Sequence, residues 1–386
     1  MNMDIRKACE TYVANTYKRY PVTFTHGEGA HLWDEEGKEY IDLGSGIAVN
    51  IFGVSDPQWA EAVTKQVRAL PHTCNLYYAE PCARLAEMLC ERTGMKKVFF
   101  SNSGAEANEC MIKTARKYGE ATGRSTIVTL KDSFHGRTIA TLAATGQDVF
   151  HQHFGPFPAG FVYAAPNDLA GLRTLCEESD ACAVMLEVVQ GEGGVQALEG
   201  EFLRGAEALC REKNMLLCID EVQTGNGRSG HLYAYMTYDL LPDIVSTAKG
   251  LGGGLPIGAT LLGEKVKNTL TYGDHGSTFG GNPVACAGAV SILSRLDEEF
   301  LQGVRERADY IRGELAGAKG VRGVDGLGLM LGVETERPAG EIVSACLARG
   351  VLVLTAKSKV RLLPPLNIGW DDLKKAISVL KEVIAA

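Results

Sequence analysis

Two charged residues lie at the ends of predicted strands in the second half of the chain. Lys249 follows the apolar run "DIVSTA" (243–248), and four of the next five residues are glycine. Asp220 ends another apolar run, "MLLCID" (215–220). Taken alone, Lys249 could be a surface lysine before a turn, and Asp220 could be a capping residue. Together they could hold an aromatic aldehyde cofactor, because the amine can condense with the aldehyde and the carboxylate can pair with a ring nitrogen.

A third feature suits a phosphate. In "SNSGAEANE" (101–109), Ser103 can cap a helix and Glu106 can reach back to complete a capping box. Gly104 and Ala105 then present backbone N–H groups at the helix start, where anions bind. An ordinary capped helix explains this stretch equally well. In combination with Lys249 and Asp220, however, it supplies the parts needed to bind pyridoxal 5'-phosphate (PLP).

These side chains need a scaffold, and the chain predicts one. From about residue 96, short apolar runs alternate with helical patterns, and helical spacing is clear over 201–214. This alternation predicts an α/β fold with a mostly parallel sheet covered by helices on both faces. Polar clusters follow five of the runs, at the strand ends where parallel sheets bind ligands. The predicted strands are "KVFF" (97–100), "STIVTL" (125–130), "ACAVMLEVV" (181–189), "MLLCID", "DIVSTA" and "GATLLG" (258–263).

The two ends of the chain predict a smaller α/β lobe. "AHLWDEEGKEYIDL" (30–43) is typical of two strands around a turn. After about residue 300 come a helix, a strand "GLGLMLGVE" (326–334) and a final helix (370–384). We expect the N-terminal hairpin to pack with this C-terminal part. The predicted domains are an N-terminal arm with part of the small domain (1–50), a large PLP-binding domain (51–285) and a C-terminal small domain (286–386).

Composition and motifs argue against nucleic acid, membrane and metal as partners of this chain. The net charge of −8 argues against nucleic acid, and no apolar run is long enough to span a membrane. The eleven cysteines form no C-x-x-C pair, which favours reduced thiols in the cytoplasm. His151 and His153 have no nearby carboxylate cluster, so we expect no metal site.

One rival function rests on glycines. Gly225, Gly227 and Gly230 match G-x-G-x-x-G, the dinucleotide fingerprint of nicotinamide-dependent oxidoreductases. The aromatic stretch that follows is interrupted by Pro242 and does not open a helix at the glycines, which weakens that reading. A non-catalytic binding protein is the third hypothesis. Visible absorption by bound PLP would separate the first hypothesis from both rivals.

Nine stretches between residues 43 and 366 resemble the class III (ornithine-type) aminotransferases of the PLP fold-type I superfamily. They are "LGSGIAVN" (43–50), "HTCNLYY" (72–78), "SNSGAEANE", "FHGRT" (134–138), "QGEGGV" (190–195), "DEVQTGNGR" (220–228), "AKGLGGGLPIGA" (248–259), "GDHGSTFGGNP" (273–283) and "RLLPPL" (361–366). The resemblance implies a homodimer with shared active sites and PLP as the cofactor.

The resemblance also implies a role for each matching residue. The implied cofactor contacts are Lys249 as the covalent attachment point and proton-shift base, Asp220 on the pyridine nitrogen, Gln223 near the ring hydroxyl, Val222 and Phe134 on the two ring faces, Gly104 and Ala105 on the phosphate, and Thr278 on the phosphate of the partner subunit's site. The implied substrate contacts are Arg137 on the distal carboxylate, Arg361 on the carboxylate beside the reacting amine, Glu192 as the partner of Arg361 when that carboxylate is absent, and Ser277.

The implied reaction moves the terminal amine of N2-acetyl-L-ornithine to 2-oxoglutarate. The products are N-acetyl-L-glutamate 5-semialdehyde and L-glutamate, in a step of arginine biosynthesis. Ornithine, succinylornithine and succinyldiaminopimelate remain alternative amino donors within the family. Members that act on ornithine carry a tyrosine where this chain has Gly46-Ile47, so its absence favours an acylated donor.

Overall fold

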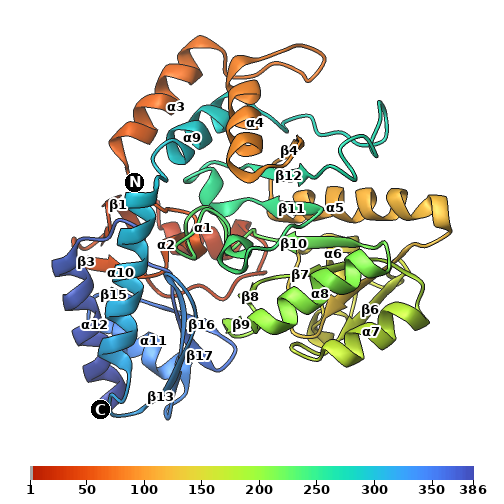
Figure 1. Cartoon of the computed structure of the whole chain (residues 1–386). Coiled ribbons are helices and arrows are strands. Elements are labelled where there is room, and N and C mark those ends of the chain that lie inside the picture. The colour runs from red at the N-terminus through yellow and green to blue at the C-terminus, as the bar shows by residue number, and fades with distance from the viewer. Residues whose placement is uncertain (1–2) are drawn as a thin grey trace.

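The computed structural model describes residues 3–386, which form a large lobe around one sheet and a smaller lobe beside it (Figure 1). The helices are α1 Ile5–Tyr12, α2 Ser45–Ala48, α3 Pro57–Ala69, α4 Glu80–Thr93, α5 Gly104–Gly119, α6 Ile139–Ala144, α7 Leu169–Glu178, α8 Gly200–Glu212, α9 Pro283–Leu293, α10 Glu298–Leu315, α11 Ala339–Ala348 and α12 Trp370–Ala385. The strands are β1 Phe24–Glu28, β2 His31–Asp34, β3 Glu39–Asp42, β4 Lys97–Ser101, β5 Thr126–Leu130, β6 Phe161–Ala164, β7 Ala181–Leu186, β8 Val189–Gln190, β9 Gln196–Ala197, β10 Leu216–Asp220, β11 Ile244–Thr247, β12 Gly258–Leu262, β13 Val321–Leu327, β14 Met330–Thr335, β15 Val351–Leu352, β16 Leu354–Ala356 and β17 Lys359–Leu362.

The large lobe is built on a seven-stranded sheet in the order β4-β12-β11-β10-β7-β5-β6. All six predicted strands are present, and β12 alone runs antiparallel to its neighbours β11 and β4. The remaining pairs are parallel. The prediction of a mostly parallel sheet is therefore confirmed. It missed β6, at the edge of the sheet.

Helices cover both faces of this sheet, as the strand composition predicts. Along β7, Ala183 and Met185 belong to the same buried cluster as Met111 of α5. The alternate residues Val184 and Leu186 belong to the other buried cluster, with Leu203 of α8. Successive side chains of a strand point to opposite faces, so a strand that is apolar throughout needs a layer on each side.

Segments from both ends of the chain form the smaller lobe. The predicted hairpin is present as β2 and β3, and β1 extends it. Ile41 of β3 pairs in parallel with Val351 of β15, so the N-terminal and C-terminal parts share one sheet (Figure 1). A second small sheet has the order β13-β14-β17-β16. The domain limits at residues 50 and 285 stay a prediction.

One sequence prediction about this lobe is wrong. The stretch 326–334 is not a single strand but the turn of a hairpin, in which β13 ends at Leu327 and β14 begins at Met330. Gly328 lies between them with φ +54°, and a Cβ there would lie 2.5 Å from the carbonyl oxygen of Arg228. Leu329 also donates its N–H to that oxygen at 2.9 Å. The glycine thus allows the turn to pack directly on the large lobe.

The glycine motif at 225–230 is a packed loop. A Cβ on Gly230 would lie 2.6 Å from Arg305 Cγ, and one on Gly225 would lie 2.8 Å from the Tyr233 ring. The segment that follows forms only a short 3₁₀ turn, Ala234–Tyr238. These glycines serve close packing, and the helix that a dinucleotide site needs does not open there.

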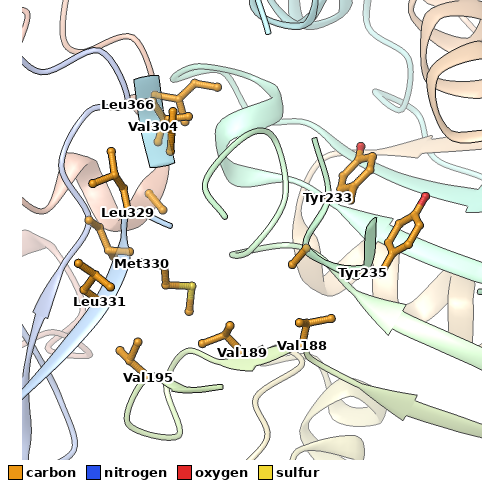
Figure 2. Packing of buried hydrophobic residues seen from close by; sticks show 14 of the residues in the cluster. Val188, Val189, Val195, Tyr233, Tyr235, Val304, Leu329, Met330, Leu331 and Leu366 are labelled. Atoms are coloured by element: carbon orange, nitrogen blue, oxygen red, sulfur yellow. The ribbon is translucent and has the colours of Figure 1, made fainter. Parts of the chain in front are cut away.

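Apolar side chains fill the space between the lobes. Figure 2 shows Met330 and Leu331 of β14 beside Val189 and Val195 of the large lobe, all of them buried. Among residues 3–386, no helix is both long enough and apolar enough to cross a membrane.

Candidate active site

A cavity of about 460 Å³ opens where the polar clusters after β4, β5, β10 and β11 meet. Parallel strands carry their carboxyl ends to one edge of the sheet, which brings these distant segments together. Eight of the predicted site residues line it: Gly104, Ala105, Phe134, Arg137, Asp220, Val222, Gln223 and Lys249.

Lys249 lies in this cavity just behind β11. Its backbone is in the left-handed region, with φ +43°, an unfavourable conformation for a residue with a Cβ. Burial lowers the pKa of Lys249 to about 8, with Glu192 opposing this effect and Arg361 adding to it. A fraction of the lysine is therefore the neutral amine at neutral pH, the form that can attack an aldehyde or take up a proton.

Asp220 is buried and fixed by three donors. Its Oδ1 accepts the N–H of Val222 at 2.9 Å, and its Oδ2 accepts Asn108 Nδ2 at 2.7 Å. His135 Nδ1 lies 2.8 Å from the same Oδ2. Asn108 is held in turn by Ser246, whose Oγ donates to Asn108 Oδ1 at 2.6 Å. This network fixes the carboxylate on the floor of the cavity.

The helix start also has the predicted form, with one difference. Ser103 Oγ accepts the N–H of Glu106 at 3.2 Å, which caps α5. The Glu106 carboxylate reaches one residue further than a capping box requires and accepts the N–H of Asn102 at 2.5 Å. Gly104 and Ala105 begin the helix and line the cavity, and the first N–H groups of a helix have no partner within it.

Arg361 and Glu192 form an ion pair at the side of the cavity. Arg361 is 3 % exposed, and its Nη1 donates to Glu192 Oε1 at 2.5 Å. Gln223, which lines the cavity, lies against both, at 3.3 Å from Arg361 Nη1 and 3.5 Å from Glu192 Oε1. Burial alone would raise the pKa of Glu192, but the charge and hydrogen bond of Arg361, together with the Lys249 charge and the Gln223 amide, outweigh it and the pKa is lowered. Arg361 Nε is buried without a partner among the described residues, so the guanidinium has a donor to spare.

The other predicted contacts, Arg137 and Ser277 for the substrate and Thr278 for the cofactor phosphate, lie nearer the surface. The exposed Arg137 guanidinium lies over Phe150 at 4.2 Å and over Phe134 at 5.5 Å from the ring centroids. Ser277 Oγ accepts Asn102 Nδ2 at 3.1 Å, and Asn102 lines the cavity. Thr278 is exposed and does not line the cavity of its own chain.

Sequence reasoning missed three residues of the site. Asn108 and His135 lie inside stretches that were recognised, but nothing local shows that both bind Asp220, which is 112 and 85 residues away. Glu187, directly after β7, lines the cavity and accepts the N–H of Phe134 at 3.4 Å. Burial, reinforced by the Asp220 charge, raises the pKa of Glu187 well above its usual range, while the Phe134 amide and the Lys249 charge oppose this effect.

The residues present fit PLP. The cavity offers phosphate donors at the start of α5, a buried carboxylate for a ring nitrogen and an amine for an aldehyde. A Cβ on Gly104 would lie 2.6 Å from Val222 Cγ1, so only glycine lets the phosphate site and the ring site lie this close. Within residues 3–386, no group of three or more His, Cys, Asp or Glu side chains is placed to hold a metal ion.

Known proteins with similar sequences and structures fit this chemistry. The family model for class-III aminotransferases matches residues 12–384. An acetylornithine aminotransferase from Haemophilus ducreyi is 50% identical over 99% of this chain and 98% of its own length. The structure of N-acetylornithine aminotransferase from Stenotrophomonas maltophilia has a TM-score of 0.85 at 36% identity and covers 98% of both chains. That of ornithine aminotransferase from Toxoplasma gondii has a TM-score of 0.95 at 30% identity, covering 99% of this chain and 94% of that one.

Proposed function

The chain belongs to the class-III aminotransferases, PLP-dependent enzymes, and we propose that it transfers the terminal amine of N2-acetyl-L-ornithine to 2-oxoglutarate. The products are N-acetyl-L-glutamate 5-semialdehyde and L-glutamate, and the reaction serves arginine biosynthesis. Relatives of this activity at 43–50% identity over nearly the whole chain support the choice of substrate.

Each residue of the site has a task in this reaction. Bound PLP supplies an aldehyde for the amine and an aromatic ring that spreads the electron pair left by a departing proton. The start of α5 would hold the phosphate, and Asp220, held in place by its three donors, would pair with a protonated ring nitrogen. Lys249 Nζ would attach the cofactor and, when substrate replaces it, carry a proton between the two carbon atoms that exchange it.

The Arg361–Glu192 pair carries the proposal. The two amino donors present different groups beside the reacting carbon, because glutamate has a carboxylate there and acetylornithine has only a methylene chain. A guanidinium binds a carboxylate through two parallel hydrogen bonds, and Arg361 has the free donor that such a grip needs. Glu192 would neutralise Arg361 while acetylornithine is bound and withdraw for glutamate or 2-oxoglutarate.

A panel of amino donors tests this function. With 2-oxoglutarate as acceptor, N2-acetyl-L-ornithine should give the highest kcat/KM among itself, L-ornithine, N2-succinyl-L-ornithine and N-succinyl-diaminopimelate. Formation of L-glutamate, the product common to all four donors, is measured. A preference for free ornithine would refute the assignment, and equal rates with the succinyl donors would broaden it to acylated donors.

Replacing Lys249 tests the cofactor site. Lys249→Ala should retain PLP through the phosphate and ring contacts but lose turnover, because the proton-carrying amine is gone. Borohydride should fix PLP covalently to the wild type and not to the variant, as read by the mass of the labelled peptide. Lys213→Ala, at a half-buried lysine directly after α8 and outside the cavity, serves as the control. A label on any other lysine of the wild type would contradict the role of Lys249.

We further propose a homodimer in the cytoplasm. Apolar side chains of the loops at 70–79 and 264–282 are exposed, and Thr278 lies among them: Leu70, Leu76, Tyr77, Tyr78, Tyr272 and Phe279. Exposed apolar patches of this kind favour a protein interface, and a second subunit there would place Thr278 near the neighbouring phosphate site. All eleven cysteines are free, which agrees with a reducing compartment.

A further inference from the structure

Two aromatic rings lie against the guanidinium of Arg137, which lines the catalytic cavity. Its Cζ lies 4.2 Å from the ring centroid of Phe150 and 5.5 Å from that of Phe134. The two rings meet edge to face, with their centroids 5.8 Å apart and an angle of 69° between their planes. Phe134 lines the cavity as well, whereas Phe150 does not. Phe150 can therefore act on a bound substrate only through its neighbours.

The Arg137 side chain is exposed, and within residues 3–386 it takes part in no ion pair. A cation over the face of an aromatic ring is attracted by the negative charge of the π system. A guanidinium held in this way keeps the N–H groups along its edge free for the two parallel hydrogen bonds that a carboxylate accepts. A permanent acidic partner would instead compete with the substrate for those N–H groups.

A short 3₁₀ turn, Asp148–Phe150, brings the second ring to Arg137. The two residues before this turn are fastened to Ser133. Gly146 donates its N–H to Ser133 Oγ at 3.0 Å, and Gln147 Nε2 donates to the Ser133 carbonyl oxygen at 3.0 Å. Because Ser133 belongs to the same loop as Arg137, the ring and the guanidinium are parts of one hydrogen-bonded unit.

We propose that Phe150 is a positioning residue for the amino donor: its ring orients the Arg137 guanidinium so that the N–H edge meets the carboxylate far from the reacting amine. The inference rests on the proposed function, in which this carboxylate belongs to N2-acetyl-L-ornithine and binds Arg137. An exposed arginine side chain moves freely in water and loses that freedom when it binds. The ring restricts the side chain beforehand, so donors that carry the carboxylate are favoured over donors that lack it.

Two donors that differ by one carboxylate test this role. N-acetyl-1,4-diaminobutane has the same chain, amide and terminal amine as N2-acetyl-L-ornithine, but no carboxylate. Stopped-flow absorbance of the PLP-loaded enzyme follows the half-reaction with each donor. Phe150→Leu should raise the apparent Kd of N2-acetyl-L-ornithine by roughly three- to tenfold and leave the limiting rate unchanged, because the carboxylate is bound before and during the reaction. The second-order rate constant for the carboxylate-free donor should not change.

Further variants separate the ring from the bulk of the side chain. Phe150→Tyr keeps the ring and should behave like the wild type. Phe150→Met removes the ring but keeps a similar volume and should reproduce Phe150→Leu, so the test does not depend on the folding of one variant. Phe161→Leu is the matched control, because it removes the ring that lies 4.8 Å from Arg116 Cζ, outside the cavity. It should change the rate with neither donor.

Arg137→Gln distinguishes this inference from the proposed function. The variant should lose most of the preference for N2-acetyl-L-ornithine over the carboxylate-free donor, and adding Phe150→Leu should then have no further effect. If Arg137→Gln keeps the preference, the carboxylate does not bind Arg137, and both that assignment and the role of Phe150 are wrong. If Arg137→Gln removes the preference but the ring-free variants keep it, or slow both donors equally, only the role of Phe150 is overturned.

Discussion

In one catalytic cycle, Arg361 lies first beside the methylene chain of acetylornithine and then beside the carboxylate of 2-oxoglutarate or glutamate. Beside the methylene chain of acetylornithine, a buried guanidinium without a partner would be costly. Glu192 removes that cost in the structure, where its Oε1 lies 2.5 Å from Arg361 Nη1. Glu192 is 32% exposed on its side chain and Arg361 only 4%, so the glutamate is the member of the pair that is free to move away.

Glu192→Ala should therefore separate the two half-reactions. The variant should slow the half-reaction with acetylornithine and spare or improve the one with glutamate. A charge-assisted hydrogen bond contributes roughly 1.5–3 kcal/mol, so the ratio of the two specificity constants should shift by about ten- to a hundredfold. Stopped-flow absorbance of the bound cofactor follows each half-reaction separately.

Glu192→Gln provides the matched comparison, because it keeps a hydrogen bond to Arg361 without the charge. Its effect should lie between those of the wild type and the alanine variant. Equal slowing of both half-reactions in Glu192→Ala would mean that Glu192 positions the cofactor or the loop and does not act as a switch.

At this scale the sequence identifies residue types better than it identifies partners. Lys249 and Asp220 follow apolar runs, so their place at one sheet edge could be predicted. The contacts of Asp220 with His135 and Asn108 depend on how loops after different strands meet, and no spacing encodes that. No feature of the sequence marks Glu187 as a site residue, because a single glutamate after a strand is common and only the three-dimensional structure shows that it is buried.

The first turn of α5 depends on a glycine, and this gives a prediction at the scale of the element. Gly104→Ala should weaken PLP binding, because its Cβ would lie 2.6 Å from Val222 Cγ1 and push that side chain toward the ring site. Overpacking costs about 1–3 kcal/mol, which corresponds to roughly a five- to 150-fold increase in the Kd of PLP. Fluorescence titration of the apoenzyme with PLP measures it.

Gly313→Ala is the control for this variant. Gly313 lies inside α10, and nothing lies within 4 Å of a Cβ at that position. Alanine there should leave PLP binding unchanged and should slightly stabilise the helix. If Gly104→Ala binds PLP as tightly as Gly313→Ala does, the close approach of α5 to Val222 is not what shapes the phosphate site.

Elements were predictable where one pattern extended over enough residues. The six predicted strands and the helices α8 and α12 show clear periodicity, and the structure contains all of them. The β13–β14 hairpin was missed because Leu327 and Leu329 continue the apolar alternation across the turn. What reverses the chain there is the left-handed Gly328 packed against Arg228, and that contact is formed between the lobes.

The buried carboxyl group of Glu221, next to Asp220 in the chain, makes the free energy of unfolding of the whole molecule depend on pH. Burial, above all, raises the pKa of Glu221 to about 7, although Thr224 and the Tyr235 amide donate to it. The pKa of Glu221 is higher in the folded than in the unfolded protein. Its contribution to the free energy of unfolding is therefore complete below about pH 4.5 and is lost as the pH rises through about 7. The shift corresponds to a change on the order of 3 kcal/mol.

Glu221→Gln should remove this dependence. Between pH 4.5 and 8, the free energy of unfolding of the variant should rise relative to that of the wild type by an amount of that order. Urea unfolding of the PLP-loaded protein at several pH values measures the difference. Glu298→Gln, at a glutamate whose side chain is 76% exposed, should track the wild type. A constant difference between Glu221→Gln and the wild type would mean that Glu221 is already ionised at acidic pH.

In the proposed dimer, each active site would contain residues from both chains, and this can be tested directly. If Thr278 contacts the phosphate in the neighbouring subunit, Thr278→Val should weaken PLP retention, and Lys249→Ala should be inactive. A heterodimer of the two variants then has one site that lacks both groups and one site that is intact. After random exchange, about a quarter of all sites should be intact, so at limiting PLP the mixture should exceed either parent. Native mass spectrometry verifies the exchange, and initial rates report the recovery. No recovery in verified heterodimers would place Thr278 in the site of its own chain, in conflict with its exposed position away from the cavity that holds Lys249.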